Sequence, residues 1–228
     1  MRFAQFALVM AAALAAAACD DDTATPASEA RVRVVHASPD APNVDVVVDG
    51  ATVLSNVPFG AASDYLPVDA GNRQLQVRPA GSSTAVIDAN QDLEDGSDYT
   101  VIASGLVANI SALALRDDNA VPAAGQIRLR VVHGAPSAPA VDVYVTAPGA
   151  DLNAATPTLS SVPFGAASNY LEVPAGNYQV RVTVAGTRTV AIDTGALSLA
   201  AGAVRTAIAL DAPGGGPPFS VLLLADRN

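Results

Sequence analysis

The sequence predicts an all-β protein made of two tandem antiparallel β-sandwich domains of the immunoglobulin-like type. The first observation is an internal duplication: residues 57–66 (VPFGAASDYL) return almost unchanged as 162–171 (VPFGAASNYL), and residues 31–45 (RVRVVHASPDAPNVD) return as 128–142 (RLRVVHGAPSAPAVD). The second is that apolar residues alternate with period two in short runs, without a sustained helical period after the N-terminal segment. Because each copy is the size of a small domain rather than of a solenoid unit, we expect two domains.

Residues 1–18 are predicted to be a signal peptide. Met1 and Arg2 give a positive start, and the apolar run that follows is too short and wrongly flanked for a membrane-spanning helix. Cys19, the single cysteine, stands where a bacterial lipoprotein carries its acylated residue, and lipidation there supplies the two anchors that stable attachment requires. Ala16 stands where lipoproteins usually carry leucine, so cleavage without lipidation, which yields a secreted protein, remains the alternative.

We therefore expect a cell-envelope protein that a lipid at Cys19 anchors to a membrane, facing the periplasm or the cell surface. Residues 19–30, with three aspartates after the cysteine, are predicted to be a polar tether. The formal net charge of the chain is −10, and all 12 basic residues are arginine. This acidity argues against nucleic acid and against anionic lipid surfaces as partners.

Residues 31–119 are predicted to form the first sandwich, with seven or eight strands. In residues 44–49 the alternate residues Val44, Val46 and Val48 share one face, and the other face carries two aspartates and a valine, as in a half-buried strand. Asp–Gly pairs at residues 49–50 and 95–96 predict hairpin turns of type I′, in which both central positions need a positive φ. Residues 38–42 (SPDAP) are predicted to be a loop, because proline cannot donate along a sheet.

Residues 120–125 are predicted to be a short linker, and residues 126–228 the second sandwich. The second copy is longer because of an insertion around residues 146–157, which we expect to be an enlarged loop. Both copies close with similar sequences, residues 109–119 and residues 218–228, which predict corresponding final strands.

The two repeated blocks resemble those of a known bacterial family, the domain of unknown function 4397. The His-loop-Asp block at residues 32–46 and the P-F-G-A-A-S-D-Y block that starts at residue 58 occur in the family's order, twice. The resemblance implies envelope or secreted proteins, commonly with a lipoprotein signal and often in tandem copies, and it implies no established activity.

Several chemistries are excluded by the residues that the chain lacks. Without lysine there is neither a Schiff-base lysine nor a P-loop lysine. With the single cysteine at the processing site, thiol catalysis and cysteine-ligated metals are excluded as well. The motifs G-x-S-x-G and H-E-x-x-H are absent. We therefore expect no enzyme, no cofactor and no metal.

A histidine–aspartate pair in each copy is the first candidate for a ligand site: His36 with Asp45, and His133 with Asp142. A proline-containing loop separates the members of each pair, so their side chains could meet across neighbouring strands. The carboxylate would then fix the tautomer of the ring and leave its other nitrogen for a ligand. The favoured alternative is structural, because a residue needed for folding is needed in every copy.

The aromatic residues of the shared motif are the second candidate. Phe59 and Tyr65, with Phe164 and Tyr170 in the second copy, could form a binding platform. An aromatic residue in this position is more often part of the core, or a tyrosine whose hydroxyl caps a loop. Residues 92–98 (DLEDGSD) resemble a calcium loop, but the second copy has no carboxylate there, so we interpret them as a turn.

The leading functional prediction is a non-catalytic binding, adhesion or assembly module of the envelope, with an envelope protein or a glycan as partner. The alternative is an accessory protein that binds a small ligand or a glycan. A ligand-binding role predicts a pocket lined by residues that differ between the two copies, since duplicated residues are mostly scaffold.

Overall fold

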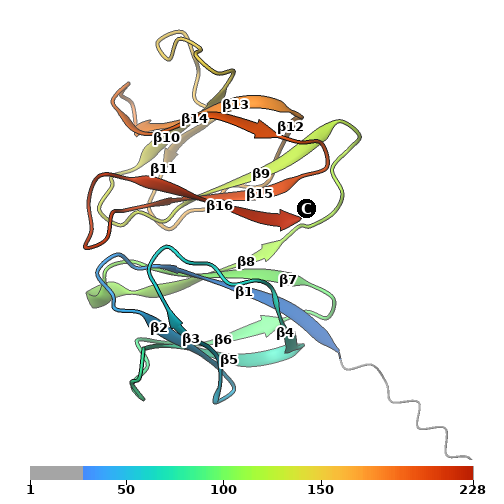
Figure 1. Cartoon of the computed structure of the whole chain (residues 1–228), viewed down its shortest axis with the longest axis vertical. Helices are drawn as coiled ribbons and strands as arrows, with labels where there is room; N and C mark the ends of the chain where they lie inside the picture. Colours follow the sequence, from blue (N-terminus) through green and yellow to red (C-terminus); the bar gives the residue numbers. More distant parts are fainter. Residues whose placement is uncertain (1–27, 228) are drawn as a thin grey trace, which may run out of the picture.

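The computed structural model describes residues 28–227, which form sixteen strands and one short 3₁₀-helix (Figure 1). The predicted signal peptide, Cys19 and most of the predicted tether lie outside the described residues. The first half contains β1 (Glu29–Ala37), β2 (Val44–Val48), β3 (Ala51–Val57), β4 (Leu66–Asp69), β5 (Gly71–Pro79), β6 (Ile87–Leu93), β7 (Asp98–Ser104), η1 (Val107–Asn109) and β8 (Ser111–Asp117). The second half contains β9 (Gln126–His133), β10 (Val141–Thr146), β11 (Leu159–Val162), β12 (Leu171–Pro174), β13 (Gly176–Val184), β14 (Val190–Leu199), β15 (Val204–Leu210) and β16 (Ser220–Arg227).

Each half is a sandwich of two four-stranded sheets, and the second half repeats the strand order of the first. The sheets are β4-β1-β7-β8 and β3-β2-β5-β6 in the first half, and β12-β9-β15-β16 and β11-β10-β13-β14 in the second. One central pair in each half is parallel, β1 with β7 and β9 with β15, whereas the other pairs are antiparallel. The all-β class and the two sandwiches are therefore confirmed. The described residues include no helix long and apolar enough to cross a membrane.

The connections lie close to the predicted positions. β1 begins at Glu29, two residues inside the segment predicted to be the tether. The predicted linker at residues 120–125 falls between β8 and β9, and the insertion at residues 146–157 falls almost entirely in the long loop between β10 and β11.

The two Asp–Gly turns differ from each other. Asp49 and Gly50 both have a positive φ, of 49° and 83°, and they join the paired strands β2 and β3 as predicted. At residues 95–96 only Gly96 has a positive φ, of 67°, and the turn joins β6 to β7, which belong to different sheets. The predicted hairpin there is wrong, because a crossing between sheets does not need the turn geometry that matches two paired strands.

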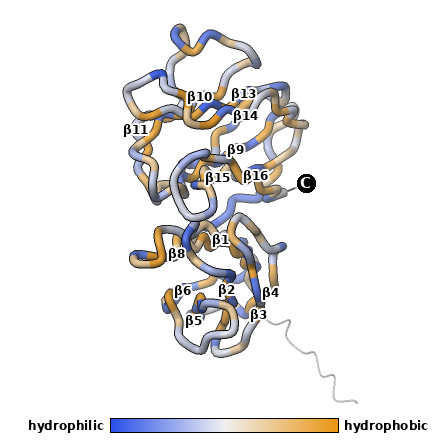
Figure 2. The backbone as a smooth tube through the Cα atoms, turned by 60° about the vertical axis from the view of Figure 1, so that its left-hand side comes forward, coloured by the Kyte–Doolittle hydropathy of each residue, from blue (hydrophilic) through white to orange (hydrophobic). Residues whose placement is uncertain are grey.

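The two halves pack against each other through one sheet from each, so that the molecule is a stack of four sheets (Figure 1). We call the contact layer between the halves the junction. Its buried apolar residues are Val35, Ala37, Ile102, Val132, Ile208, Leu210 and Leu224. Along β1 alternate residues serve different layers: Val34 lies in the core of the first sandwich and Val35 in the junction. Residues 116–119, with which the chain leaves β8 toward the second half, are hydrophilic (blue in Figure 2).

Candidate functional site

His36 is fully buried and is held by the loop that follows its own strand. Its Nε2 lies 3.1 Å from the carbonyl oxygen of Pro42, and the Ser38 N–H donates to its Nδ1 over 3.4 Å. Since a carbonyl oxygen only accepts, these contacts fit a neutral ring with its proton on Nε2. Burial lowers the pKa of His36, and the contact with Pro42 opposes this effect only in part. Neither ring nitrogen is left for a ligand.

His133 repeats this arrangement in the second half. Its Nε2 lies 3.0 Å from the carbonyl oxygen of Pro139, and the Ala135 N–H donates to its Nδ1 over 3.4 Å. Phe164 meets the ring edge-on, with 6.1 Å between ring centroids, and Phe59 lies in the same way at 6.2 Å from the first histidine. The two phenylalanines thus pack against the histidines rather than form an open platform.

The two aspartates of the predicted pairs bind loop backbone instead of imidazole. Asp45 accepts the N–H of Asn56 over 2.7 Å and the N–H of Gly81 over 3.0 Å, and these hydrogen bonds lower the pKa of its carboxyl group. Asp142 accepts two backbone N–H groups in the equivalent places, both over 2.8 Å. The geometry matches the structural interpretation of these residues and leaves the histidines without a carboxylate partner.

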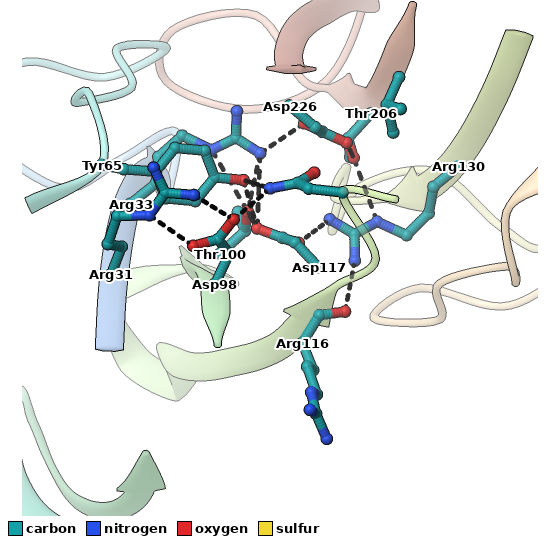
Figure 3. A network of polar contacts seen from close by, with 12 residues as sticks. Arg31, Arg33, Tyr65, Asp98, Thr100, Arg116, Asp117, Arg130, Thr206 and Asp226 are labelled. Atoms are coloured by element: carbon teal, nitrogen blue, oxygen red, sulfur yellow. Dashed lines mark hydrogen bonds and ion pairs between the residues drawn. The ribbon is translucent and has the colours of Figure 1, made fainter. Parts of the chain in front are cut away.

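The two repeated tyrosines lie at the junction, where their hydroxyl groups bind buried carboxylates, as Figure 3 shows for Tyr65. Tyr65 donates to Oδ2 of Asp117 over 2.6 Å, and the hydroxyl of Thr100 donates to the same oxygen over 2.6 Å. Tyr170 repeats the first contact with Asp226 over 2.9 Å. Burial raises the pKa of both tyrosines, so their hydroxyl groups stay protonated and act as donors.

Two arginines cross the junction and complete this network. Arg33 of the first half donates to Oδ1 of Asp226 over 2.6 Å, and Arg130 of the second half donates to Oδ1 of Asp117 (Figure 3). Each guanidinium also donates to the carbonyl oxygen of the residue that precedes this aspartate. Both arginine side chains are only 4% exposed and both aspartate side chains 0%.

The resulting cluster of two positive and two negative charges is reciprocal, as in a two-fold symmetric interface. Every charge is paired across the junction, and each arginine also lies over a tyrosine ring: Arg33 is 4.7 Å from the centroid of Tyr65, and Arg130 is 4.8 Å from that of Tyr170. A buried charge is tolerated when it is paired and hydrogen-bonded in this way. The cluster therefore joins the two halves, and none of its four charges is left unpaired for a substrate to bind.

Sequence reasoning missed these arginines and their aspartates. A usable signal is present, because an arginine interrupts the same apolar strand in both copies, at Arg33 and Arg130. An aspartate also stands at or next to the end of the final strand of both copies, at Asp117 and Asp226. A charge that recurs at one position inside an apolar strand needs a buried partner. Nothing in the sequence alone says that the partner lies in the other copy.

A cavity of about 410 Å³ opens in the second half between β14 and β16, which are the edge strands of its two sheets. It reaches from the buried residues Leu129 and Ala207, 2% and 6% exposed, to Leu223, which is 40% exposed. The residues that line it are Leu129, Val180, Ala191, Ile192, Asp193, Thr194, Leu197, Leu199, Ala207, Phe219, Ser220, Val221 and Leu223. Ten of these thirteen are apolar.

The core of the first half is more nearly filled. Its cavity measures about 20 Å³ and shares only part of an equivalent lining, because it also extends to Val46, Val53 and Leu66 on the side of β2, β3 and β4. Leu75 of β5 occupies the position of Val180 of β13. Val101 of β7 occupies the position of Ala207 of β15, as the matching registers against β1 and β9 show. At both positions the second half carries the smaller side chain, which leaves volume unfilled.

A β-bulge in β14 widens the same region. The register between β13 and β14 shifts opposite Val180, where Gly195 has a φ of 64°, whereas β5 and β6 pair without a shift. The hydroxyl of Thr194 accepts the N–H of Val180 over 3.0 Å and donates to the carbonyl oxygen of Gly195 over 2.9 Å. Bulges re-aim side chains and often lie beside binding sites.

No metal site is formed within residues 28–227, where no group of three or more His, Cys, Asp or Glu side chains could hold an ion. The carboxylates of the calcium-like segment bind protein groups instead. Asp98 accepts from Arg31 over 2.6 and 2.7 Å, and Asp95 accepts the N–H of Glu29 over 3.0 Å.

A protein-family model described as a domain of unknown function, DUF4397, matches residues 6–47, 30–144 and 145–228. These segments cover most of the chain, and the resemblance seen in the two repeated blocks is confirmed. No curated protein matches the chain.

Three solved structures show a weak likeness. The carbohydrate-binding module CBMbc (family CBM26) of Eubacterium rectale Amy13K, solved with maltoheptaose, is 9% identical, with 88% of this chain and 98% of that chain covered and a TM-score of 0.27. A leucine-rich repeat protein from Bacteroides thetaiotaomicron is 16% identical, with coverages of 83% and 27% and a TM-score of 0.21. A candidate cell-adhesion protein from Bacteroides fragilis is 12% identical, with coverages of 87% and 98% and a TM-score of 0.23. At such TM-scores these likenesses carry no argument about function.

Proposed function

Since this chain belongs to the family described as a domain of unknown function, DUF4397, membership brings no activity with it, and we propose a function from the geometry. The protein is a non-catalytic binding protein of the bacterial cell envelope, and its second half holds a small, largely apolar ligand between β14 and β16. The first half and the junction serve as a rigid base for this site.

The observation that carries the proposal is the difference between the two halves. The same fold with the same strand order holds a cavity of about 410 Å³ in one copy and about 20 Å³ in the other. Ligand pockets of globular proteins begin at about 300 Å³ and are mostly apolar. An open apolar cavity of this size leaves aliphatic side chains in contact with water, so a ligand that covers them stabilises the protein.

The residues with catalytic potential support a non-catalytic role. Both ring nitrogens of His36 and of His133 are engaged by their own loops. The buried carboxylates Asp117 and Asp226 are neutralised by arginines across the junction. A general base must reach the proton that it abstracts, and none of these groups lines the cavity.

Placement in the envelope rests on the signal-peptide pattern and on Cys19. Replacing Cys19 by serine removes the thiol that would carry the lipid. We expect the wild-type protein in the membrane fraction of the cell and the Cys19→Ser variant in the soluble fraction. Equal distribution of both proteins would reject the lipid anchor without affecting the proposal about the cavity.

Binding is tested with the chain carrying Cys19→Ser, handled without detergent, and the apolar fluorescent probe N-phenyl-1-naphthylamine. We expect saturable binding of one probe per chain. The double variant Val180→Leu/Ala207→Val places the larger side chains of the first half at two positions of the cavity lining. It is expected to abolish binding of the probe. The matched control Leu75→Val/Val101→Ala makes the reverse changes in the first half and is expected to leave binding in the second half intact. Binding that survives in the filled variant would reject the proposal.

A further inference from the structure

We propose that the cavity between β14 and β16 takes the hydrocarbon chain of a free single-chain amphiphile, such as a fatty acid or a long-chain alcohol, and leaves its polar group at the mouth. This inference rests on the proposed function and deepens it, because it names the class of ligand.

The cavity has a buried end and an open end, which suits a molecule with one apolar and one polar end. Leu129 and Leu199, at the buried end, are 2% and 6% exposed, whereas Leu223 at the mouth is 40% exposed. The mouth lies between two edge strands of different sheets, β14 and β16, so no row of backbone hydrogen bonds closes it. A ligand can therefore enter end-on and keep a polar group in water.

The rim of the cavity is more apolar than the same region of the first half. Leu197 of β14 stands where β6 has Gln91, because each lies opposite the third residue of the neighbouring strand. Leu223 of β16 likewise stands where β8 has Ala114, as the pairing with β15 and β7 shows. The second half has thus gained apolar surface at the entrance while losing side-chain volume inside, and both changes favour a hydrocarbon.

The three polar residues of the lining offer little to a polar ligand. The Thr194 hydroxyl is already bonded on both sides within the bulge. Asp193 lies next to the core residue Ile192 in the strand and so points to the outer face, where Gln179 donates to both of its oxygens over 2.8 and 3.0 Å. Ser220 alternates in the same way with Phe219 and Val221, which pack against the core.

A sugar is disfavoured by the same lining. Its hydroxyl groups would lose water without gaining partners, which is costly for each buried polar group. Phe219 is the only aromatic residue in the lining, so a stacking platform of several rings is absent from it. A hydrocarbon chain gives up no hydrogen bond on entering and gains contact with aliphatic side chains along its length.

The test uses the chain carrying Cys19→Ser and measures displacement of N-phenyl-1-naphthylamine by 1-hexanol, 1-octanol and 1-decanol, with maltoheptaose as a polar comparison. We expect affinity to rise about fourfold for each added methylene, the factor that corresponds to burying one methylene group. We expect no displacement by the sugar. The Val180→Leu/Ala207→Val variant, which should not bind the probe, should show no probe signal that the alcohols can displace.

The outcomes separate the inference from the proposed function. If the probe binds in the cavity but the alcohols compete without regard to chain length, the protein is a binding protein for another apolar class, and this inference is wrong. If neither probe nor alcohols bind, both fail. In a further arm the same chain is sedimented with phosphatidylcholine vesicles. We expect it to stay in the supernatant, and co-sedimentation would overturn the assignment to a free amphiphile.

Discussion

The two halves of this chain are most alike where they meet and least alike at the open edge of the second sandwich. At the junction each charge of one half has a twin in the other, with Arg33 and Arg130 reaching across to Asp226 and Asp117. At the edge the counterparts differ in size and polarity, and the cavity between β14 and β16 measures about 410 Å³, against about 20 Å³ for the cavity in the core of the first half. The contrast teaches that the duplicated residues maintain the stack, whereas the residues that diverged mark the candidate site.

The likeness at the junction is tested most severely by removing one of its charges. Arg33→Met leaves Asp226 buried without its counterion, and we expect the free energy of unfolding to fall by about 3–5 kcal/mol in urea titrations. Arg130→Met should cost a similar amount, because the contacts are reciprocal. The double variant Arg33→Met/Asp226→Leu should recover most of the loss. A single-variant cost below about 1 kcal/mol, as for an exposed pair, would contradict the buried network.

The difference in core packing is tested by exchanging side-chain sizes between the halves. Leu75→Val/Val101→Ala opens the filled core of the first half, and we expect it to destabilise the protein by about 2–3 kcal/mol. Val180→Leu/Ala207→Val narrows the buried part of the cavity in the second half and should stabilise the protein by about 1 kcal/mol. Both values come from the same urea titrations. Destabilisation by the filling variant would show that the cavity walls cannot accept the larger side chains.

The histidine loops are a second shared feature, expected to respond to substitution alike in both halves. His36→Phe keeps a ring but removes the donor to the Pro42 carbonyl, and we expect a loss of about 1–2 kcal/mol. His133→Phe, which removes the donor to Pro139, should cost about as much. Clearly different losses of stability in the two variants would show that the two histidine loops are not equivalent.

The pH dependence of stability supplies a further test of His36. Its pKa is lowered in the folded protein, so below about pH 6.5 the unfolded chain binds a proton that the folded chain does not. The contribution of the neutral His36 ring to the free energy of unfolding is therefore fully present above this pH. The free energy of unfolding falls as the pH drops below it. The His36→Phe variant should lose stability less steeply between pH 7 and pH 5. If the free energy of unfolding falls equally with pH in the wild type and in the variant, the ring of His36 is not buried in its neutral form.

The smallest expected effect concerns Asp118, which has no buried role. Its ion pair with Arg128 lowers the pKa of its carboxyl group to about 2, but its side chain is 55% exposed. Screening by solvent limits the effect of Asp118→Asn to below about 1 kcal/mol at pH 7 and low salt. Since the folded pKa is depressed, this contribution is present above about pH 4 and is lost as the pH falls toward 2. A loss of stability as large as that of Arg33→Met would show that the exposure of Asp118 does not limit the strength of its ion pair with Arg128.

Much of the fold follows from local sequence. Period-two alternation specifies strands, because successive side chains point to opposite faces whatever the partner strand is. The turn at Asp49–Gly50 is specified by two positions that take a positive φ. The same dipeptide at residues 95–96 misleads, because the sequence does not say that the chain there passes from one sheet to the other.

The candidate site was only partly accessible to sequence reasoning. The expectation that a ligand pocket is lined by residues that differ between the copies stays a prediction, and by itself it singles out neither β14 nor β16. The histidine–aspartate pairs were individually plausible, yet their side chains bind separate loops. Val180 and Ala207 give no sign in sequence that they face an opening, because a cavity is a shortage of volume summed over several strands.

By itself the sequence determined the all-β class, because strand alternation is a pattern of neighbouring residues, and the duplication, because the two copies can be compared directly in it. It also determined the exclusion of Schiff-base and P-loop lysine chemistry, because lysine is absent from it. Only the tertiary structure decided that the arginine of each copy pairs with the aspartate of the other, and that the second copy is hollow where the first is full. Both depend on which side chains meet across sheets far apart in the chain, and on whether their charges balance and their volumes fill the space between them.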